Sequence, residues 1–411
     1  MSIFSGASGA SGASGASGAS GASGASGASG ASGASGAGGA IGGFVFSGPG
    51  YNPPYIDALI TNRDGTVGRS LRPERREHVP PELPLEYDEN DRDQVNLRRL
   101  GPGERASIFD FELISRISLE AGEGKISIRS DGQLLASFTR PTPEIFLDQL
   151  ALVESYTDLR PDRAAEIVSQ LGVPHAFFGS IAFLHPERTK WTMELIYTAL
   201  RFAYAVVMRT KYALACRRPH EYSPQIQPII ACPLHGSLPS GHATEAFMFA
   251  HLLAILSTDE GSLHGQVEKL RIDDREVESR SVWVNHLMRQ ANRIAVNRTV
   301  AGVHFPVDSV AGALLGLTLA EYLVSLLTGK LDGKQQGYHF IGKHYPPRYG
   351  DGGINADFKW QNFYDVDKRK LSLSKDVEPY VEVEANELRR KASRPLQWLW
   401  KKAKDEWSAT E

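Results

Sequence analysis

The chain has 411 residues and a formal net charge of −3, and its length is ample for a buried core. Because acidic and basic residues nearly balance and no long basic run occurs, the composition argues against a general nucleic-acid binder. The cysteines Cys216 and Cys232 are too few for a disulfide framework and lack zinc-site spacing. We therefore expect reduced thiols that pack as small apolar groups.

The first segment is a repeat. Ser-Gly-Ala occurs eleven times in succession over residues 5–37, and the stretch to residue 43 adds only small residues and Ile41. A sequence with so little apolar surface cannot offset the backbone entropy lost on ordering, so residues 1–43 are predicted to form a flexible tail. Glycine at every third position also fits a collagen strand, but the prolines of collagen are missing. No Sec-type signal is apparent, but export by another route stays open, so the localisation is unknown and a soluble, cytoplasmic protein is the default expectation.

Residues 44–140 are predicted to form an irregular arm with a small β-hairpin, packed on the body. Residues 44–105 are rich in Pro, Arg, Asp and Glu and show little periodicity. Residues 125–138 place Asp131-Gly132 between two runs of mixed apolar and polar residues, which is a strong hairpin signal. We expect this hairpin to be the main β-structure of the chain.

Residues 141–345 are predicted to form a mainly α-helical catalytic body. A capped segment at 161–171 is followed by long apolar-periodic segments at 190–217, 241–257, 279–296 and 309–328, each long enough for a helical bundle. The last of these is very apolar, but it contains Glu321 and stands nearly alone, so we expect a buried helix and no transmembrane span.

Residues 346–411 are predicted to form a charged C-terminal extension. Within it, the segment that starts at Arg394 carries Trp398 and Trp400 between basic residues. We expect a helix that packs on the body or on a second copy of the chain, which leaves a homo-oligomer open.

Lys211 and Arg218 form the first chemically informative pair. They lie seven residues apart near the end of the 190–217 segment, before Pro219. Seven residues are two helical turns, so both side chains are predicted to project from one face of one helix. A solvated basic face is the simpler interpretation of this segment alone.

The second segment is Pro239-Ser240-Gly241-His242, which directly precedes an apolar-periodic run. Ser240 is therefore predicted to cap the helix, with the following amides pointing outward. A helix start of this kind binds anions, and Gly241 permits close approach to the backbone. A plain cap with a surface histidine at His242 is the alternative.

The third segment contains Arg298, His304 and Asp308, which we place in a loop that enters the 309–328 helix. If that helix begins near Pro306, Asp308 falls in its first turn and can accept the Nδ1 proton of His304, which leaves Nε2 free. A core histidine beside a capping aspartate competes with this interpretation. Together the three segments supply the cations, imidazoles, hydroxyl and amides needed to hold a tetrahedral oxyanion, so we expect an enzyme.

As they stand, the three segments resemble the motifs of the vanadium-dependent haloperoxidase and type 2 phosphatidic acid phosphatase superfamily. The matching elements are Lys-x6-Arg-Pro, Pro-Ser-Gly-His and Arg-x5-His-x3-Asp, while Asn297 stands where the superfamily has serine. The resemblance covers residues 190–328 and implies a helical bundle of that type.

By this resemblance, the chain would bind vanadate and use hydrogen peroxide to oxidise a halide, with a small organic acceptor. His304 would bond to the metal, and His242 would act as acid–base on the cofactor. Asp308 would orient His304. The residues that would hold the oxygens of vanadate are Lys211, Arg218, Ser240, Gly241 and Arg298.

Two other functions are alternatives to this one. In a soluble acid phosphatase of the same superfamily, the cations would hold a phosphate monoester, His304 would attack phosphorus to form a phosphohistidine, and His242 would protonate the leaving alcohol. A non-catalytic oxyanion-binding scaffold would be expected to lack His242 or His304, and both are present.

His235 favours the bromide-oxidising branch. It lies seven residues before His242 and is similar to the second active-site histidine of the bromoperoxidases. Arg209 is similar to a pocket arginine of that branch, although Met208 replaces its aromatic neighbour. An ordinary loop histidine is the alternative for His235.

Overall fold

A computed structural model describes Asn62 and residues 92–408, except 260, 263, 266–267, 273–274, 330–335, 347–355 and 387–391. The predicted tail and, within the predicted arm, residues 44–61 and 63–91 lie outside the described residues. The α-helices are α5 (Arg92–Arg99), α6 (Pro102–Ile114), α7 (Pro143–Ser155), α8 (Arg160–Ser169), α9 (His175–Ala182), α10 (Lys190–Leu214), α11 (Pro219–Tyr222), α12 (Gly241–Thr258), α13 (Ser279–Val300), α14 (Pro306–Thr328) and α15 (Arg394–Asp405). The strands are β1 (Ile117–Gly122), β2 (Lys125–Ser130), β3 (Gln133–Thr139), β4 (Lys269–Ile272), β5 (Arg275–Glu278), β6 (Gln336–Ile341), β7 (Tyr364–Asp365), β8 (Lys370–Leu371) and β9 (Val381–Ala385). Short 3₁₀ turns are η2 (Thr157–Leu159), η3 (Gly342–His344) and η4 (Trp360–Asn362).

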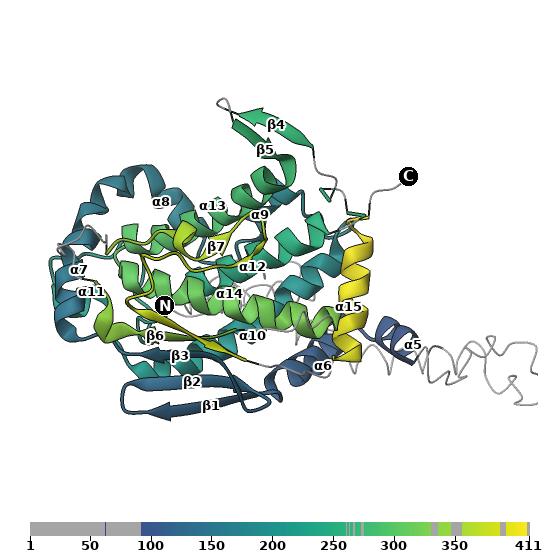
Figure 1. The fold of residues 1–411 in the computed structure, drawn as a ribbon, viewed down its shortest axis with the longest axis horizontal. Coiled ribbons are helices and arrows are strands. Elements are labelled where there is room, and N and C mark those ends of the chain that lie inside the picture. The colour runs from purple at the N-terminus through teal and green to yellow at the C-terminus, as the bar shows by residue number, and fades with distance from the viewer. Residues whose placement is uncertain are drawn as a thin grey trace, which may run out of the picture.

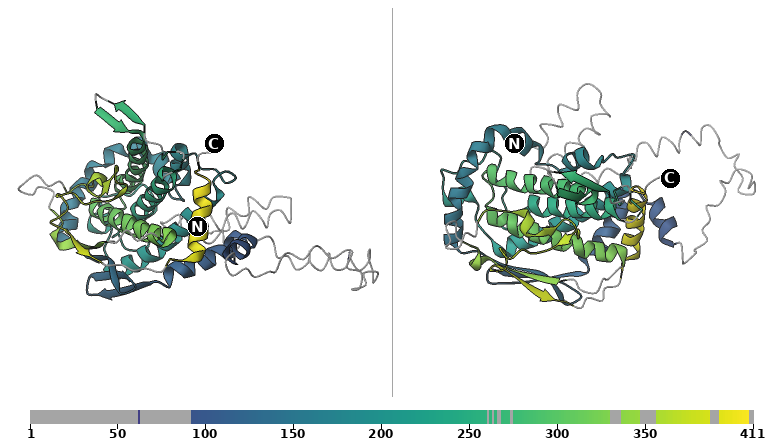
Figure 2. Two further views of the ribbon diagram at one scale, coloured as in Figure 1. Left: turned by 45° about the vertical axis from the view of Figure 1, so that its right-hand side comes forward. Right: turned by 45° about the horizontal axis from the view of Figure 1, so that its top comes forward.

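The body is a helical bundle around α12, which confirms the predicted mainly α-helical class. Helix α12 is buried on nearly every side, as its apolar composition around the whole circumference requires. It packs against α10, α13 and α14, and Figures 1 and 2 show it in the middle of the bundle. All four long helices predicted from periodicity are present, with ends that differ by a few residues.

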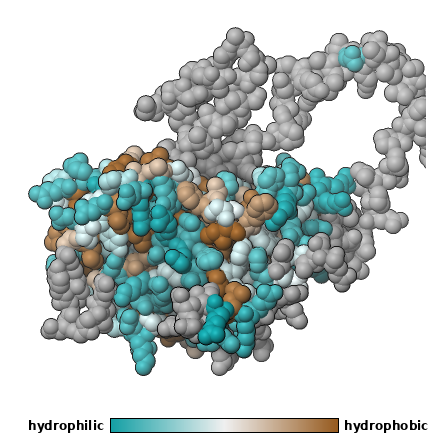
Figure 3. Space-filling model, turned by 90° about the horizontal axis from the view of Figure 1, so that it is seen from above, coloured by the Kyte–Doolittle hydropathy of each residue, from teal (hydrophilic) through white to brown (hydrophobic). Residues whose placement is uncertain are grey.

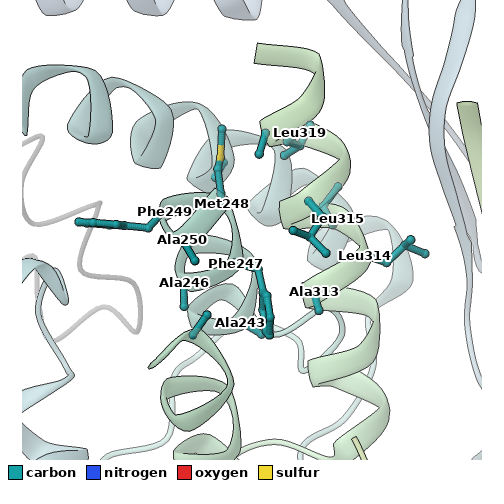
Figure 4. Packing of buried hydrophobic residues seen from close by; sticks show 14 of the residues in the cluster. Ala243, Ala246, Phe247, Met248, Phe249, Ala250, Ala313, Leu314, Leu315 and Leu319 are labelled. Atoms are coloured by element: carbon teal, nitrogen blue, oxygen red, sulfur yellow. The ribbon is translucent and has the colours of Figure 1, made fainter. Parts of the chain in front are cut away.

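Helices α12 and α14 approach each other unusually closely because α14 carries glycine where the two backbones meet. A Cβ atom at Gly312 would lie 2.6 Å from the Ser240 carbonyl oxygen, and one at Gly316 would overlap the Thr244 carbonyl. Apolar side chains of both helices fill the space around this contact (Figure 4). The contact sets the position of the α12 N-terminus against α14.

The predicted hairpin is confirmed, but it is part of a larger sheet. Asp131 and Gly132 both have positive φ (51° and 77°), as a tight two-residue turn requires, and β2 pairs with β3 across it. The described strands form a sheet in the order β1-β2-β3-β6-β9, with β6 parallel to β3. The expectation that the hairpin would be the main β-structure was wrong, because strands from distant parts of the chain extend it. The sheet lies along one side of α10 and α14 (Figure 1).

The described part of the predicted irregular arm contains two helices. In α6, Pro102 opens the helix, and the buried Ala106, Phe109 and Leu113 recur at helical spacing. Arg105 extends from α6 to the buried Glu194 of α10, at 2.6 and 2.8 Å. The charge-rich composition therefore did not reveal that α6 is a helix that packs on the bundle.

The C-terminal helix α15 packs on the body, as predicted. Its apolar residues are buried, and Trp398 meets Trp191 edge-on with ring centroids 5.1 Å apart. Beyond the helix, the Glu406 carboxylate accepts hydrogen bonds from the backbone amides of Trp191 (2.9 Å) and Thr192 (2.8 Å). These are amides at the start of α10 that have no partner within their helix. A homo-oligomer stays a prediction.

One helix among the described residues, Pro306–Thr328, is long and apolar enough to cross a membrane. However, 83% of its most apolar window is buried inside the protein, as in the core helix of a globular bundle. The predicted buried helix is therefore what the structure shows for this segment.

Gly316→Ala should reduce the free energy of unfolding by about 1–3 kcal/mol, because the added methyl overlaps the Thr244 carbonyl and the tightly packed helices must separate. Chemical denaturation measures this loss. Gly122→Ala, where an added Cβ meets no atom within 4 Å, is the control and should change stability by less than about 0.5 kcal/mol. Equal effects of the two substitutions would contradict the close helix contact.

Candidate functional site

Lys211 lies at the end of α10 and is buried, with 1% of its surface exposed. The helix ends at Leu214 because Ala215 takes a left-handed conformation (φ 47°). The Lys211 ammonium donates to the carbonyls of Gly236 (2.9 Å) and Ser237 (2.8 Å). A Cβ at position 236 would lie 3.1 Å from the Lys211 carbonyl, so glycine lets this loop lie against the helix end.

Arg218 also points into the site, but from a different element. The prediction that it shares a helix with Lys211 was wrong, because the chain turns at Ala215 and Arg218 instead caps the short helix α11. Its guanidinium is buried and donates to the carbonyls of Val303 (2.7 Å) and His235 (3.1 Å). The two cations converge through tertiary packing rather than through helical periodicity.

His304 and Asp308 form the predicted pair. Helix α14 begins at Pro306, and Asp308 Oδ2 accepts hydrogen bonds from His304 Nδ1 (2.9 Å) and the Phe305 amide (2.9 Å). The Ser237 hydroxyl donates to the same oxygen. With Nδ1 protonated, His304 Nε2 carries the lone pair, and it lies 3.4 Å from an amino nitrogen of Arg218. The predicted orientation is confirmed, with Nε2 turned toward a cation.

The start of α12 supplies backbone donors beside this pair. Ser240 is the predicted N-cap and accepts from the Ala243 amide at 3.4 Å, while its own amide donates to the Asp308 carbonyl at 2.8 Å. The amides of Gly241 and His242 have no hydrogen-bond acceptor within the described part of the chain. The His242 ring is buried, and its Nε2 lies 3.0 Å from the Gln170 carbonyl, so it is not a surface histidine.

Arg298 lies in the last turn of α13, not in a loop as predicted. The helix continues to Val300, and Gly302, with a φ of 78°, follows its end. Arg298 is buried and donates to the Ile167 carbonyl (3.1 Å) and to Gln170 Oε1 (3.0 Å). Its Nε and second amino nitrogen are buried without a partner among the described residues. Such unsatisfied donors on a buried cation are suited to an anion.

Asn297, which stands at the serine position of the superfamily motif, contacts helix α8. Its side-chain nitrogen donates to Glu166 and Gln170, both at 2.9 Å, and its oxygen accepts from Arg163 at 3.0 Å. Because Gln170 also contacts Arg298 and His242, the end of α8 lies directly over two residues of the cluster.

The electrostatics favour a bound anion. Burial lowers the pKa of Lys211, with a further contribution from Arg218, and lowers the pKa of Arg298 to about 10. Burial likewise lowers the pKa of His242 and His304, so both rings are neutral at pH 7. Three cations thus face one buried carboxylate, and an oxyanion would relieve the excess positive charge.

The Asp308 carboxyl group has a raised pKa. Burial raises the pKa of Asp308 to about 6, against hydrogen bonds from Ser237 and the Phe305 amide and the attraction of Lys211 and Arg218. Asp308 is therefore largely ionised at pH 7 only because these donors and cations surround it.

Three residues near the cluster were missed from the sequence. Ser237 and Gln170 act through contacts with residues about 70 positions away, which no local pattern reveals. Glu245 is buried one turn after Gly241, and burial raises its pKa to about 8 while Lys211 lowers it. An acidic residue in an otherwise apolar helical run was the available signal for Glu245.

His235 reaches the edge of the cluster, whereas Arg209 does not. The half-buried His235 ring places Nδ1 3.3 Å from Arg218 and 3.2 Å from the Gly236 carbonyl, contacts that select opposite tautomers. Its Nε2 is buried with no partner among the described residues, and burial lowers its pKa to about 4. Arg209 lies on the exposed side of α10 over the Tyr212 ring.

The cysteines are both free. Cys216 is buried, as predicted, and burial raises the pKa of its thiol to about 12. Cys232 is half-buried, with its sulfur 3.2 Å from His220 Nδ1.

Comparison with known proteins is informative over the part of the chain that carries this cluster. Residues 191–331 match the PAP2 superfamily. The match begins in α10, ends just after α14, and includes all three motifs. A search of curated proteins found no match. Members of this superfamily are usually enzymes, phosphatases or haloperoxidases among them, which agrees with a buried site built for an oxyanion.

Inorganic phosphate should raise the melting temperature of the protein at constant ionic strength, because an anion at about 100 times its dissociation constant stabilises by about 2.7 kcal/mol. Arg298→Gln should lose most of this increment. Arg201→Gln, which breaks a buried pair with Asp110, should lower the starting stability but keep the increment. A phosphate effect that persists in Arg298→Gln would contradict an anion site at this cluster.

Proposed function

We propose that the protein is a vanadate-dependent haloperoxidase that oxidises a halide, preferentially bromide, with hydrogen peroxide to hypohalous acid. The observation that carries the choice is His235, whose imidazole contacts Arg218 and keeps its Nε2 without a partner among the described residues. The phosphatase reaction uses His304 and His242 and gives no role to an imidazole at the position of His235. Burial keeps this second imidazole neutral at pH 7, and a neutral imidazole beside the cluster suits hydrogen bonding to peroxide.

The residues present fit vanadate as a cofactor. His304 Nε2 offers a lone pair of fixed orientation, Arg298 offers two unsatisfied N–H groups, and the Gly241 and His242 amides are open. When bound there, vanadate would supply the Lewis-acid centre that activates peroxide toward halide. The remaining residues that would hold it are Lys211, Arg218 and Ser240.

The protein's own groups would supply orientation and proton transfer. Asp308 keeps the proton of His304 on Nδ1, so that Nε2 remains a donor of electrons. His242, kept neutral by burial, can accept a proton from the oxyanion site and return it. For this role its ring must exchange the Gln170 carbonyl for a bound group. A small organic acceptor would react with the hypohalous product.

The second candidate is a phosphatase, which the His304–Asp308 pair supports directly. In this reaction His304 Nε2 would attack phosphorus, the bond from phosphorus to the ester oxygen would break, and His242, protonated when the anionic ester binds, would give that proton to the leaving alcohol. Water would then hydrolyse the phosphohistidine. A non-catalytic scaffold is disfavoured, since both histidines lie buried within the cluster.

Orthovanadate should switch on bromide-dependent peroxidase activity in protein freed of bound anions, and excess phosphate should compete with it, because both anions require the same cations. Dye bromination with peroxide measures the activity. If vanadate produces no halogenation while a phosphomonoester is hydrolysed, the phosphatase is the correct function.

Two matched variants separate binding from turnover in the same assay. His304→Ala should remove most vanadate affinity, whereas His242→Ala should still bind vanadate but turn over about 10²–10⁴-fold more slowly. Equal loss of vanadate binding in both would contradict these roles.

Replacing His235 with Ala or Phe should change the bromide kinetics and their pH dependence while vanadate affinity falls much less than in His304→Ala. The reason is that the His235 ring contacts the cluster through Arg218, while its buried Nε2 has no partner among the described residues. Steady-state rates against bromide at several pH values measure the effect. Unchanged profiles in both variants would identify His235 as an ordinary loop residue.

A further inference from the structure

A pocket that is separate from the oxyanion cluster lies between α8, α9, α13 and the η4 turn. Its volume is about 700 Å³, a size typical of small-molecule sites. The face of the molecule that carries α8, α9 and α13 is largely hydrophilic where it is described (Figures 1 and 3). The residues that give the pocket its chemistry are Arg163, His286, Arg289, Gln290, Arg293 and Trp360.

The pocket is cationic. None of the described residues that line it is acidic. Arg293 is paired with Glu166 at 2.8 Å, but the exposed side chain of Arg289 has no hydrogen bond or ion pair to any described residue. Arg163 uses one amino nitrogen for Asn297, and the Gln290 side-chain nitrogen is buried with no described partner. Three arginines, Arg163, Arg289 and Arg293, therefore line the same space and make it positively charged.

We propose that this pocket binds a small organic polyanion that carries phosphate or carboxylate groups. Planar guanidinium groups recognise both kinds of oxyanion through paired hydrogen bonds, and two or more arginines within one pocket favour a ligand with more than one negative charge. The volume is far larger than a single inorganic anion fills. Ile181, Val296 and the largely buried Trp360 supply the apolar part of the lining, which the carbon skeleton of such a ligand would contact.

The pocket is connected to the oxyanion cluster through hydrogen bonds. Arg163 contacts Asn297, Arg293 contacts Glu166, and both of these acceptors contact Gln170. Gln170 in turn contacts Arg298 and His242. A polyanion that draws Arg163 or Arg293 toward itself weakens the hydrogen bonds of that arginine to Asn297 or Glu166. The hydrogen bonds of Asn297 and Glu166 to Gln170 then weaken as well. Binding in the pocket is therefore coupled to the anion affinity of the cluster, and the coupling acts equally in both directions.

The test is calorimetric titration of the full-length protein with citrate, as the carboxylate probe, and with pyrophosphate, as the phosphate probe. Arg289→Glu should weaken binding of at least one probe about tenfold or more, the effect of losing a charged hydrogen bond. Arg98→Glu, the same change at an exposed position on α5, should weaken it less than about threefold, because a remote surface charge is screened.

The proposal is overturned if neither probe binds the wild-type protein at millimolar concentration, or if Arg98→Glu weakens binding as much as Arg289→Glu. It is also overturned if Arg298→Gln abolishes binding while Arg289→Glu has no effect, since the probes then occupy the oxyanion cluster. These titrations require neither vanadate nor turnover, so their outcome is independent of the proposed peroxidase activity. The Arg289 side chain makes no hydrogen bond or ion pair to a described residue, and melting curves of the variants verify that they are folded.

Discussion

The site depends on the hydrogen bonds that Asp308 accepts. One carboxylate oxygen accepts from His304, Ser237 and the Phe305 amide, and the backbone carbonyl of the same residue accepts from the Ser240 amide. These contacts join the start of α14, the loop that receives Lys211 and the start of α12. A buried carboxylate without such donors would take up a proton, so the geometry of the site and the charge of Asp308 maintain each other.

The cations of the cluster are held mainly by backbone carbonyls. Lys211 is fixed by two carbonyl oxygens of the 236–237 loop, Arg218 by those of His235 and Val303, and Arg298 by that of Ile167. Carbonyl dipoles orient a cation without cancelling its charge, whereas carboxylates would neutralise it. Buried charge that no carboxylate cancels destabilises the fold. The same excess charge would favour a tetrahedral anion at this position, as the proposed function requires.

The features that were predictable from sequence are those encoded by neighbouring residues. The Asp131-Gly132 turn, the Ser240 cap and the placement of Asp308 one turn after His304 each follow from a short segment, and the structure confirms them. The predictions for Arg218 and Arg298 were wrong because they depended on where a helix ends. Tertiary contacts at the last turn decide that point, and a short sequence segment does not reveal them. Gln170 and strand β6 could not have been placed, since their partners lie far away in the chain.

The cap that Glu406 provides for α10 has a consequence for the order of folding. The amide of Trp191 is 215 residues earlier in the chain than the carboxylate that satisfies it. At translation rates of 5–20 residues per second, this carboxylate is made roughly 10–40 s after the helix. During that interval, the helix that carries Lys211 leaves the ribosome with its first amides open to water. The cap of α10 therefore cannot form in order of synthesis, because it requires one of the last segments of the chain to be made.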